Sequence, residues 1–171
     1  VLADPMPGAC RAAARLYGRP VVVADGGALP FPDATFDAAW CLGVLSTVPH
    51  QARVVGELRR VVRDGGAVGW LVFVRTGSLP EQPEGNHFPD QDGLAELLAR
   101  AGLTVTAEAA LADFPAADES WRHQADLVDR VVERDHGGDE RLRSADEQAA
   151  TMGRLLDDGL VVGRLLVTRA G

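Results

Sequence analysis

The chain has 171 residues, 46% of them hydrophobic and 25% charged, which is the balance of an ordinary globular domain. The 25 acidic residues outnumber the 17 basic ones, all arginine, and the net charge of -8 argues against a protein that binds a nucleic-acid backbone. No apolar run approaches the roughly 18 residues that cross a bilayer, and no basic leader precedes an apolar segment, so we predict neither a membrane partner nor a signal peptide.

The cysteine content is low. Cys10 and Cys41 are the two cysteines of the chain, too few for a disulfide framework or a zinc site. We expect both to be buried as small apolar side chains, in a protein of the reducing cytoplasm. The polar run at residues 135–140 has no ligand spacing typical of a metal loop, so we predict no metal.

Apolar runs and amphipathic segments alternate along the chain. The run Val21–Ala24 is continuously apolar, which is typical of a parallel strand covered on both faces. In the segment Pro49–Arg63 the apolar side chains recur on one stripe, which indicates a helix. The same reasoning predicts strands at 1–3, 21–24, 36–45, 67–75, 103–110 and 160–168, and helices at 7–17, 49–63, 90–101, 116–133 and 144–157.

This order of elements predicts an α/β fold with a Rossmann-like, doubly wound and mostly parallel sheet. We expect the last two strands to form an antiparallel edge hairpin, so that the sheet ends in an antiparallel edge strand. The sequence contains no repeat and no linker, which favours one domain over residues 1–171. The segment 118–158 is too long for a simple connection between neighbouring strands, and we expect a helical insertion that covers a pocket.

Two of the predicted strands end in an acidic residue. Asp4 follows the apolar run at 1–3, and Asp25 follows Val21–Ala24 one strand later. Doubly wound sheets bind ligands outside the carboxyl ends of their strands, where a carboxylate can accept both hydroxyls of a ribose. We therefore expect both carboxylates to line one nucleoside site. The alternative for each is a turn residue, since Pro5 follows the first and two glycines follow the second.

The segment from Asp25 to Asp37, with Leu-Pro-Phe-Pro-Asp at positions 29–33, resembles a stretch of the class I S-adenosylmethionine-dependent methyltransferases that act on small molecules. The helix at 57–63 and the Asp-Gly-Gly at 64–66 match the segments that follow in this family. The resemblance covers residues 1–74 well, and the order of elements extends it to residue 168. It implies S-adenosylmethionine as the cofactor and a small-molecule methyl acceptor.

The resemblance also implies a role for each matching residue. Asp4 matches the carboxylate that binds the ribose hydroxyls, and Met6 matches the side chain against one face of the adenine. Asp25 matches the acceptor of the adenine amine, with Gly26 giving close backbone approach. Cys41 and Leu42 end the strand that faces the methionine part of the cofactor. The alternative for Met6 is that its side chain packs against the protein and does not contact the adenine.

One departure from the family pattern lies at the start of the chain. The resemblance begins at the family's second strand, without the first strand and its Gly-rich loop. We expect an N-terminally incomplete sheet whose open edge pairs with a second copy, and weak cofactor binding by this chain alone. Two explanations stay open at this point: upstream residues that are missing from the chain, or a degenerate relative.

A general base helps methyl transfer to a hydroxyl or an acidic carbon, and histidine suits that role near neutral pH. His123, beside Trp121 in the helical insertion, and His87, in a Gly- and Pro-rich loop, are the candidates. His50 and His136 fit solvated surface positions better.

Two other functions fit parts of this sequence. One is a non-catalytic, truncated methyltransferase-like module for binding or assembly, which the missing strand favours. The other is a nicotinamide-dependent oxidoreductase, because Asp4 could hold a nicotinamide ribose, although the Leu-Pro-Phe-Pro-Asp turn has no role there.

Overall fold

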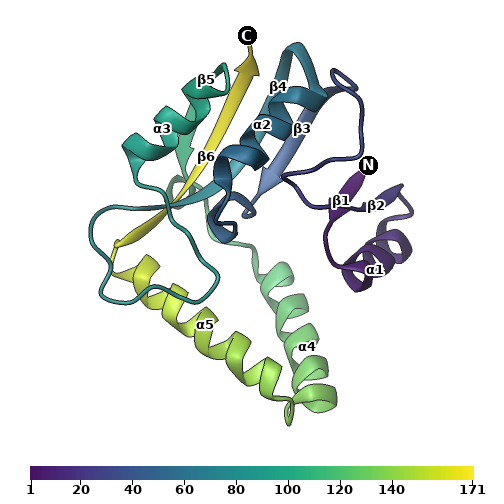
Figure 1. Ribbon diagram of the computed structural model, residues 1–171. Helices are drawn as coiled ribbons and strands as arrows, with labels where there is room; N and C mark the ends of the chain where they lie inside the picture. Colours follow the sequence, from purple (N-terminus) through teal and green to yellow (C-terminus); the bar gives the residue numbers. More distant parts are fainter.

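The computed structural model describes the whole chain, residues 1–171. Strands and helices follow one another in the predicted order (Figure 1). The elements are β1 (Leu2–Asp4), α1 (Pro7–Tyr17), β2 (Val21–Val23), β3 (Phe36–Leu42), η1 (Leu45–Thr47), α2 (Gln51–Val61), β4 (Val62–Arg75), α3 (Gln91–Arg100), β5 (Leu103–Ala110), η2 (Leu111–Asp113), α4 (Glu119–His136), α5 (Glu140–Asp157) and β6 (Val161–Ala170).

The strands form two sheets. A four-stranded sheet has the order β3-β4-β6-β5, and a two-stranded sheet pairs β1 with β2. β1 and β2 are parallel, as are β3 and β4, whereas β6 runs antiparallel to both of its neighbours. The predicted α/β class is therefore confirmed, with one correction: the antiparallel strand is internal, and β5 forms the edge, because β6 returns between β4 and β5.

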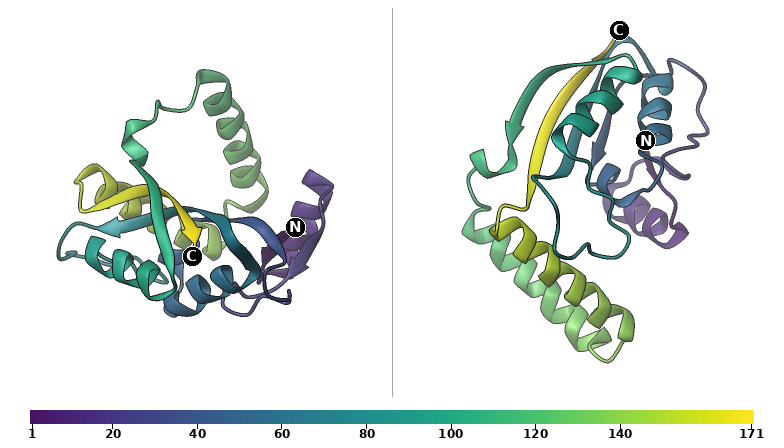
Figure 2. Two further views of the ribbon diagram at one scale, coloured as in Figure 1. Left: turned by 90° about the horizontal axis from the view of Figure 1, so that it is seen from above. Right: turned by 60° about the vertical axis from the view of Figure 1, so that its left-hand side comes forward.

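Helices α2 and α3 cover one face of the four-stranded sheet (Figure 2). The core between them consists of aliphatic side chains around Trp70, whose exposed fraction is 1%. The Trp70 Nε1–H donates to the hydroxyl of Thr168 on β6 at 3.0 Å, so the one polar group of this indole is satisfied inside the core.

The first 24 residues form a separate unit of β1, α1 and β2. Cys10 on α1 is buried between the strands, and its Sγ lies 3.3 Å from the carbonyl oxygen of Asp4 and 3.4 Å from that of Val22. This unit lies beside β3, with β1 the nearer strand (Figure 1), and no backbone hydrogen bond joins β1 to β3. The facing edges of β1 and β3 thus remain unpaired.

Several predicted boundaries shift in the structure. Helix α1 has the predicted ends, because proline opens it and Gly18, at φ 58°, closes it. Helix α2 ends at Val61, so Asp64–Gly66 lies at the irregular start of β4 rather than at a helix end, and Gly65 there has φ 73°. Helix α5 begins at Glu140, four residues before the predicted start.

Helices α4 and α5 project from the end of the sheet at which β3 terminates (Figure 1). α4 has no buried residue, and its Trp121 is 67% exposed. α5 is anchored by Leu155, which packs with Phe88 and Val161 in a small second core. None of the helices has the length and apolar character needed to cross a membrane.

Candidate functional site

The gap between the two sheets holds an apolar pocket of about 140 Å³. β1 and the end of β2 supply one wall, and β3 with helix α2 supplies the other. The lining residues are Ala3, Asp4, Pro5, Ala24, Gly26, Leu29, Trp40, Cys41, Val44, Val54 and Leu58. Sites for whole small-molecule ligands are typically about 300–1,000 Å³, so this pocket fits one part of such a ligand.

Asp4 and Asp25 are held in the same way at the ends of adjacent parallel strands. Oδ1 of Asp4 accepts the backbone N–H of Met6 at 2.7 Å, and Oδ1 of Asp25 accepts that of Gly27 at 2.6 Å. The backbone N–H of Ala24 donates to the carbonyl of Asp4 at 3.1 Å, which ties the two strand ends together. Oδ2 of each carboxylate has no protein partner, so each can accept hydrogen bonds from a ligand.

Cys41 and Val54 are the two most buried residues of the pocket wall, each 4% exposed. Burial raises the pKa of the Cys41 thiol to about 11, against the smaller lowering effect of a hydrogen bond from the backbone of Leu45. The thiol is therefore neutral near pH 7 and serves as wall rather than as nucleophile. Leu42, the next residue, is exposed and does not line this pocket, and neither does the exposed Met6.

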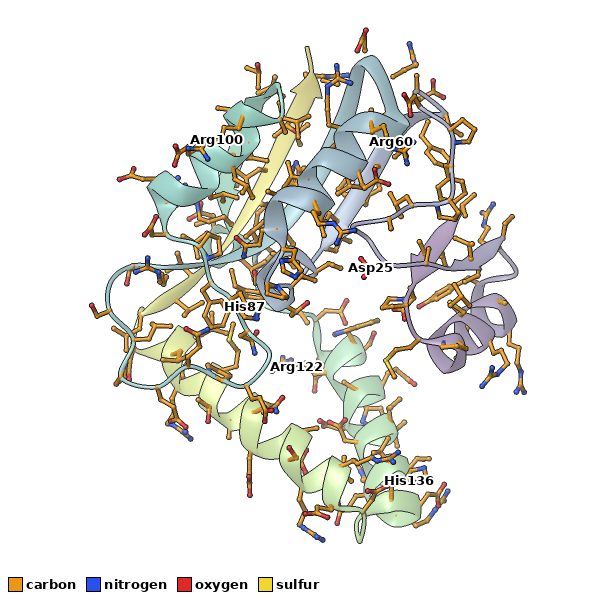
Figure 3. The ribbon with its side chains drawn as sticks, viewed as in Figure 1. Asp25, Arg60, His87, Arg100, Arg122 and His136 are labelled. Carbon is orange, nitrogen blue, oxygen red and sulfur yellow. The ribbon has the colours of Figure 1, made fainter.

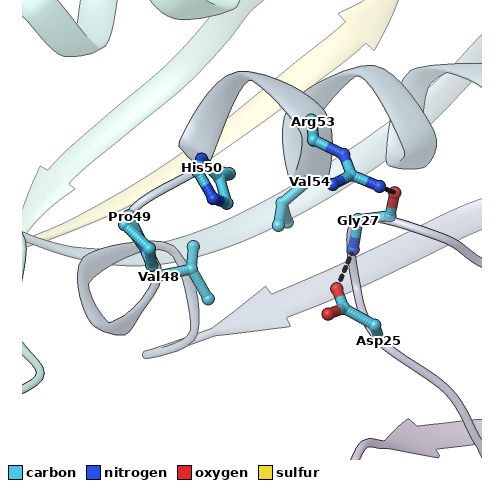
Figure 4. A pocket seen from close by; sticks show the side chains of 7 residues that line it. All are labelled: Asp25, Gly27, Val48, Pro49, His50, Arg53 and Val54. Atoms are coloured by element: carbon cyan, nitrogen blue, oxygen red, sulfur yellow. Dashed lines mark hydrogen bonds between the residues drawn. The ribbon is translucent and has the colours of Figure 1, made fainter.

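A second, smaller pocket adjoins the first and shares Val54 with it (Figure 4). Asp25 and Gly27 form one side, and His50 and Arg53 at the start of α2 form the other. Arg53 Nη2 donates to the carbonyl of Gly27 at 3.5 Å. Asp25 thus lines this second pocket together with His50 and Arg53, whereas Asp4 lines the first, so the two carboxylates lie on adjoining pockets rather than in one.

Neither of the two predicted base candidates lines these pockets, and Figure 3 shows His87 apart from Asp25. His87 is exposed in the loop between β4 and α3. Its backbone N–H donates to the carbonyl of Ser46 at 2.6 Å, and its carbonyl accepts from Gln51 Nε2 at 2.5 Å. His123 lies on the first turn of α4 beside Asp118, Glu119 and Ser120, on an open surface. The structure does not bring either imidazole to the nucleoside side of the site.

Most of the wall was not predicted from the sequence, and its larger side chains include Trp40, Val54 and Leu58. Trp40 lies across Gly69 of the neighbouring strand, where a Cβ would meet the indole at 2.5 Å. The exposed fraction of Trp40 is 73%, which is unusual for tryptophan in a strand and places a large apolar surface at the gap. The sequence signal that could have found Trp40 is its place next to Cys41, a residue predicted to lie near the cofactor. Val54 and Leu58 follow only from the packing of α2.

Residues 1–69 match the family model of the methyltransferase domain. In structure, geranyl diphosphate methyltransferase in complex with SAM matches 99% of this chain with a TM-score of 0.66, at 12% identity. The chain has the fold of the class I methyltransferases. The resemblance that the Leu-Pro-Phe-Pro-Asp segment indicated is thereby confirmed.

Relatives with this methyltransferase sequence pattern include several named enzymes. The 27-O-demethylrifamycin SV methyltransferase of Amycolatopsis mediterranei is 32% identical over 93 residues, which are 54% of this chain and 31% of that protein. The malonyl-[acyl-carrier protein] O-methyltransferase of Pseudescherichia vulneris is 43% identical over 60 residues, 35% of this chain and 24% of that protein. The chain therefore spans less than a third of the length of each of these two relatives.

The methyltransferase fold also occurs in a protein named for another reaction. The [4+2]-cyclase SpnF matches 95% of this chain, and 60% of its own, with a TM-score of 0.66 at 22% identity. The solved geranyl diphosphate enzyme is likewise matched over 67% of its chain. Because one fold carries several chemistries, the reaction has to be argued from the site.

Proposed function

We propose that the whole protein binds S-adenosylmethionine and transfers its methyl group to a small-molecule acceptor. The observation that carries the proposal is the pair of strand-end carboxylates, Asp4 and Asp25. Each presents one free oxygen, and each is oriented by a backbone N–H two residues later. Ribose hydroxyls and the adenine amine are donors that such oxygens accept. The names of the relatives, which act on several small molecules, support the choice of reaction.

The residues of the pocket fit the nucleoside end of the cofactor. Ala3, Ala24 and Leu29 give an apolar wall, and Gly26 leaves room for close approach to the backbone. A volume of about 140 Å³ suits that part alone. When bound, S-adenosylmethionine supplies an activated methyl group on its sulfonium, and the protein supplies mainly alignment.

The open edges of β1 and β3 are part of this proposal. The facing edges of β1 and β3 are mostly exposed, and each presents unpaired backbone N–H and C=O groups that a further strand can pair with. We assign that strand to residues of the whole protein outside the 171 described, and its following loop to the amino-acid end of the cofactor. A longer protein that includes such a strand should melt at higher temperature and bind the cofactor more tightly than residues 1–171 alone. Equal melting and equal affinity would contradict this assignment.

The acceptor side is assigned to α4 and α5. These helices project beside the strand end that carries the site, and α4 exposes Trp121, which can line an apolar pocket. His123 and His87 stay candidates for a general base on this side. Cytoplasmic location, the pairing of two copies and the lack of a nucleic-acid partner stay predictions.

Calorimetric titration of the whole protein with S-adenosylhomocysteine tests the function. Asp4→Ala and Asp25→Ala should each weaken binding by about 1.5–3 kcal/mol, which is the usual loss of a charged hydrogen bond and about 10- to 100-fold in Kd. Asp64→Ala is the matched control, because it removes the same charge from an exposed side chain paired with Arg59. Unchanged affinity in both strand-end variants would remove the assignment.

A further inference from the structure

Two side chains of α2, Glu57 and Arg60, are joined into one hydrogen-bonded unit, which we call the α2 clamp. Arg60 Nε and Nη2 donate to the two carboxylate oxygens of Glu57, at 2.7 and 2.8 Å. Both side chains are only partly exposed, that of Arg60 at 31% and that of Glu57 at 20%. The pair raises the pKa of the Arg60 guanidinium and lowers that of the Glu57 carboxyl, so both stay charged.

The α2 clamp bonds the loop between β2 and β3 at every second residue, 29, 31 and 33. Glu57 Oε2 accepts the backbone N–H of Leu29 at 2.7 Å, and Arg60 Nη2 donates to the Leu29 carbonyl at 3.0 Å. Arg60 Nη1 donates to the carbonyl of Phe31 at 2.7 Å and to Oδ1 of Asp33 at 2.8 Å. One guanidinium therefore bonds three residues, Leu29, Phe31 and Asp33, along a stretch of five.

The loop depends on these bonds because its sequence gives it few of its own. Pro30 and Pro32 have no N–H, and the loop belongs to neither sheet, so its carbonyls have no strand partner. The planar guanidinium has donors on both of its edges, which lysine lacks. The carbonyl of Arg60 also accepts the N–H of Ala34 at 2.8 Å, which fixes the far end of the loop.

The same loop links the unit of residues 1–24 to the rest of the molecule. No residue of that unit belongs to the main core, whereas Leu29 and Phe31 pack against it. Asp25 opens the loop, and a turn from its carbonyl to the N–H of Ala28, at 3.0 Å, places it directly before Leu29. The bonds from the α2 clamp to Leu29 therefore help to fix where Asp25 lies relative to β3.

We infer that the α2 clamp is a positioning device for the nucleoside end of the site, fixing Asp25 and Gly26 against Cys41 and Val54. The inference rests on the proposed function. Without the clamp, the loop has to be ordered when the ligand binds, and this ordering costs affinity. The clamp lies away from the reacting methyl group, so its loss raises KM for S-adenosylmethionine and leaves kcat unchanged.

The test uses Arg60→Ala, Arg60→Lys and Glu57→Gln in the whole protein. Arg63→Ala is the matched control, because it removes the ion pair to Asp37, at 2.6 Å, from just beyond the same helix without touching the loop. Affinity for S-adenosylhomocysteine and the steady-state constants are measured at a temperature where each variant is fully folded. We expect about tenfold weaker binding for Arg60→Ala and less than about twofold for the control.

Ligand-free hydrogen exchange adds a second readout. The amides of Gly27 and Leu29 should exchange faster in Arg60→Lys than in the parent protein, and should be unchanged in Arg63→Ala. If Arg60→Ala does not fold, the Lys and Glu57→Gln variants decide. Clamp variants that melt earlier but bind with parental affinity overturn the inference alone. Failure of the unaltered protein to bind overturns the proposed function, and the inference with it.

Discussion

The indole of Trp70 and the hydroxyl of Thr168 meet at 3.0 Å inside the core, although 98 positions separate them in the chain. Thr168 also donates to the carbonyl of Val68 at 3.3 Å, so the hydroxyl acts as acceptor and donor at once. The bond crosses from β4 to β6 and joins the first half of the chain to its last strand. The buried hydroxyl is therefore a polar link in an otherwise apolar layer.

Thr168→Val should destabilise the protein by about 1–3 kcal/mol. The valine has nearly the same shape, but it leaves the Trp70 N–H buried without an acceptor. Urea unfolding at neutral pH measures the change in the free energy of unfolding. Thr168→Ser, which keeps the hydroxyl, is the control and should lose less. A Val variant as stable as the parent would show that the hydrogen bond contributes nothing.

Two glycines near the junction of α2 and β4 should respond in opposite directions to alanine. At Gly66 a Cβ would lie 2.7 Å from the carbonyl oxygen of Arg63 and 2.8 Å from that of Asp37, so backbone has to move. At Gly56, within α2, it meets nothing within 4 Å. We expect Gly66→Ala to destabilise by about 1–3 kcal/mol and Gly56→Ala to stabilise by about 0.5–1 kcal/mol. Thermal unfolding measures both changes in stability. If both variants are stabilised, or both destabilised, the packing described around these two glycines is wrong.

The Glu57 carboxyl gives a stability contribution that depends on pH. Its folded-state pKa is lowered, first by the hydrogen bond from Arg60, so the contribution is present above the unfolded pKa of about 4.3 and is lost as the pH falls through the folded value. The stability difference between the parent protein and Glu57→Gln should be full near neutral pH and should shrink as the solution is acidified below the unfolded pKa. A difference that does not change with pH would mean that the carboxylate charge is not involved.

Cys41 should react slowly with alkylating reagents in the folded protein. With a pKa of about 11, roughly one thiol in a thousand is ionised at pH 8. Iodoacetamide labelling followed by mass spectrometry should show slow modification in buffer and fast modification in urea. Labelling of Cys41 in buffer at the rate of an exposed thiol would contradict the buried placement.

Helix α4 should be the least protected long helix in hydrogen exchange. It has no buried residue, whereas Val68, Val72 and Val74 of β4 are almost fully buried. We expect α4 amides to exchange within a small fraction of the time that residues 68–74 require, and to slow when an acceptor binds. Equal protection of both segments without ligand would count against a mobile cover.

Local signals predicted much of the fold. Proline at the start and Gly18 at the end bound α1 correctly, and the apolar runs located each strand. The place of β6 between β4 and β5 could not be read, because periodicity says which residues are buried and not which strands are neighbours. The same limit applies to Asp64–Gly66, where a helix-ending pattern lies at the start of a strand because α2 already ends at Val61.

Some residues of the candidate site could be predicted from the sequence, and others could not. Asp4, Gly26 and Cys41 line the pocket between the sheets, since each lies at or near a strand end, and Asp25 lines the smaller pocket beside it. The cofactor roles that the family resemblance implied for these residues stay predictions. Val54 reaches the pocket between the sheets from a helix, and only the packing of α2 on the sheet determines which side chain faces the gap. Nearness in sequence to Trp121 did not place His123 in a pocket with the carboxylates, because α4 projects away from the sheet.

The internal position of β6 also constrains how the protein is made. β4 leaves the ribosome long before β6, and until then it has β3 as its sole strand partner, with a long and strongly apolar edge open to solvent. Pairings between segments so distant in the chain close slowly. During synthesis the nascent chain therefore carries an exposed strand edge for the time needed to add roughly another hundred residues, and this is the interval in which a chaperone has most to protect.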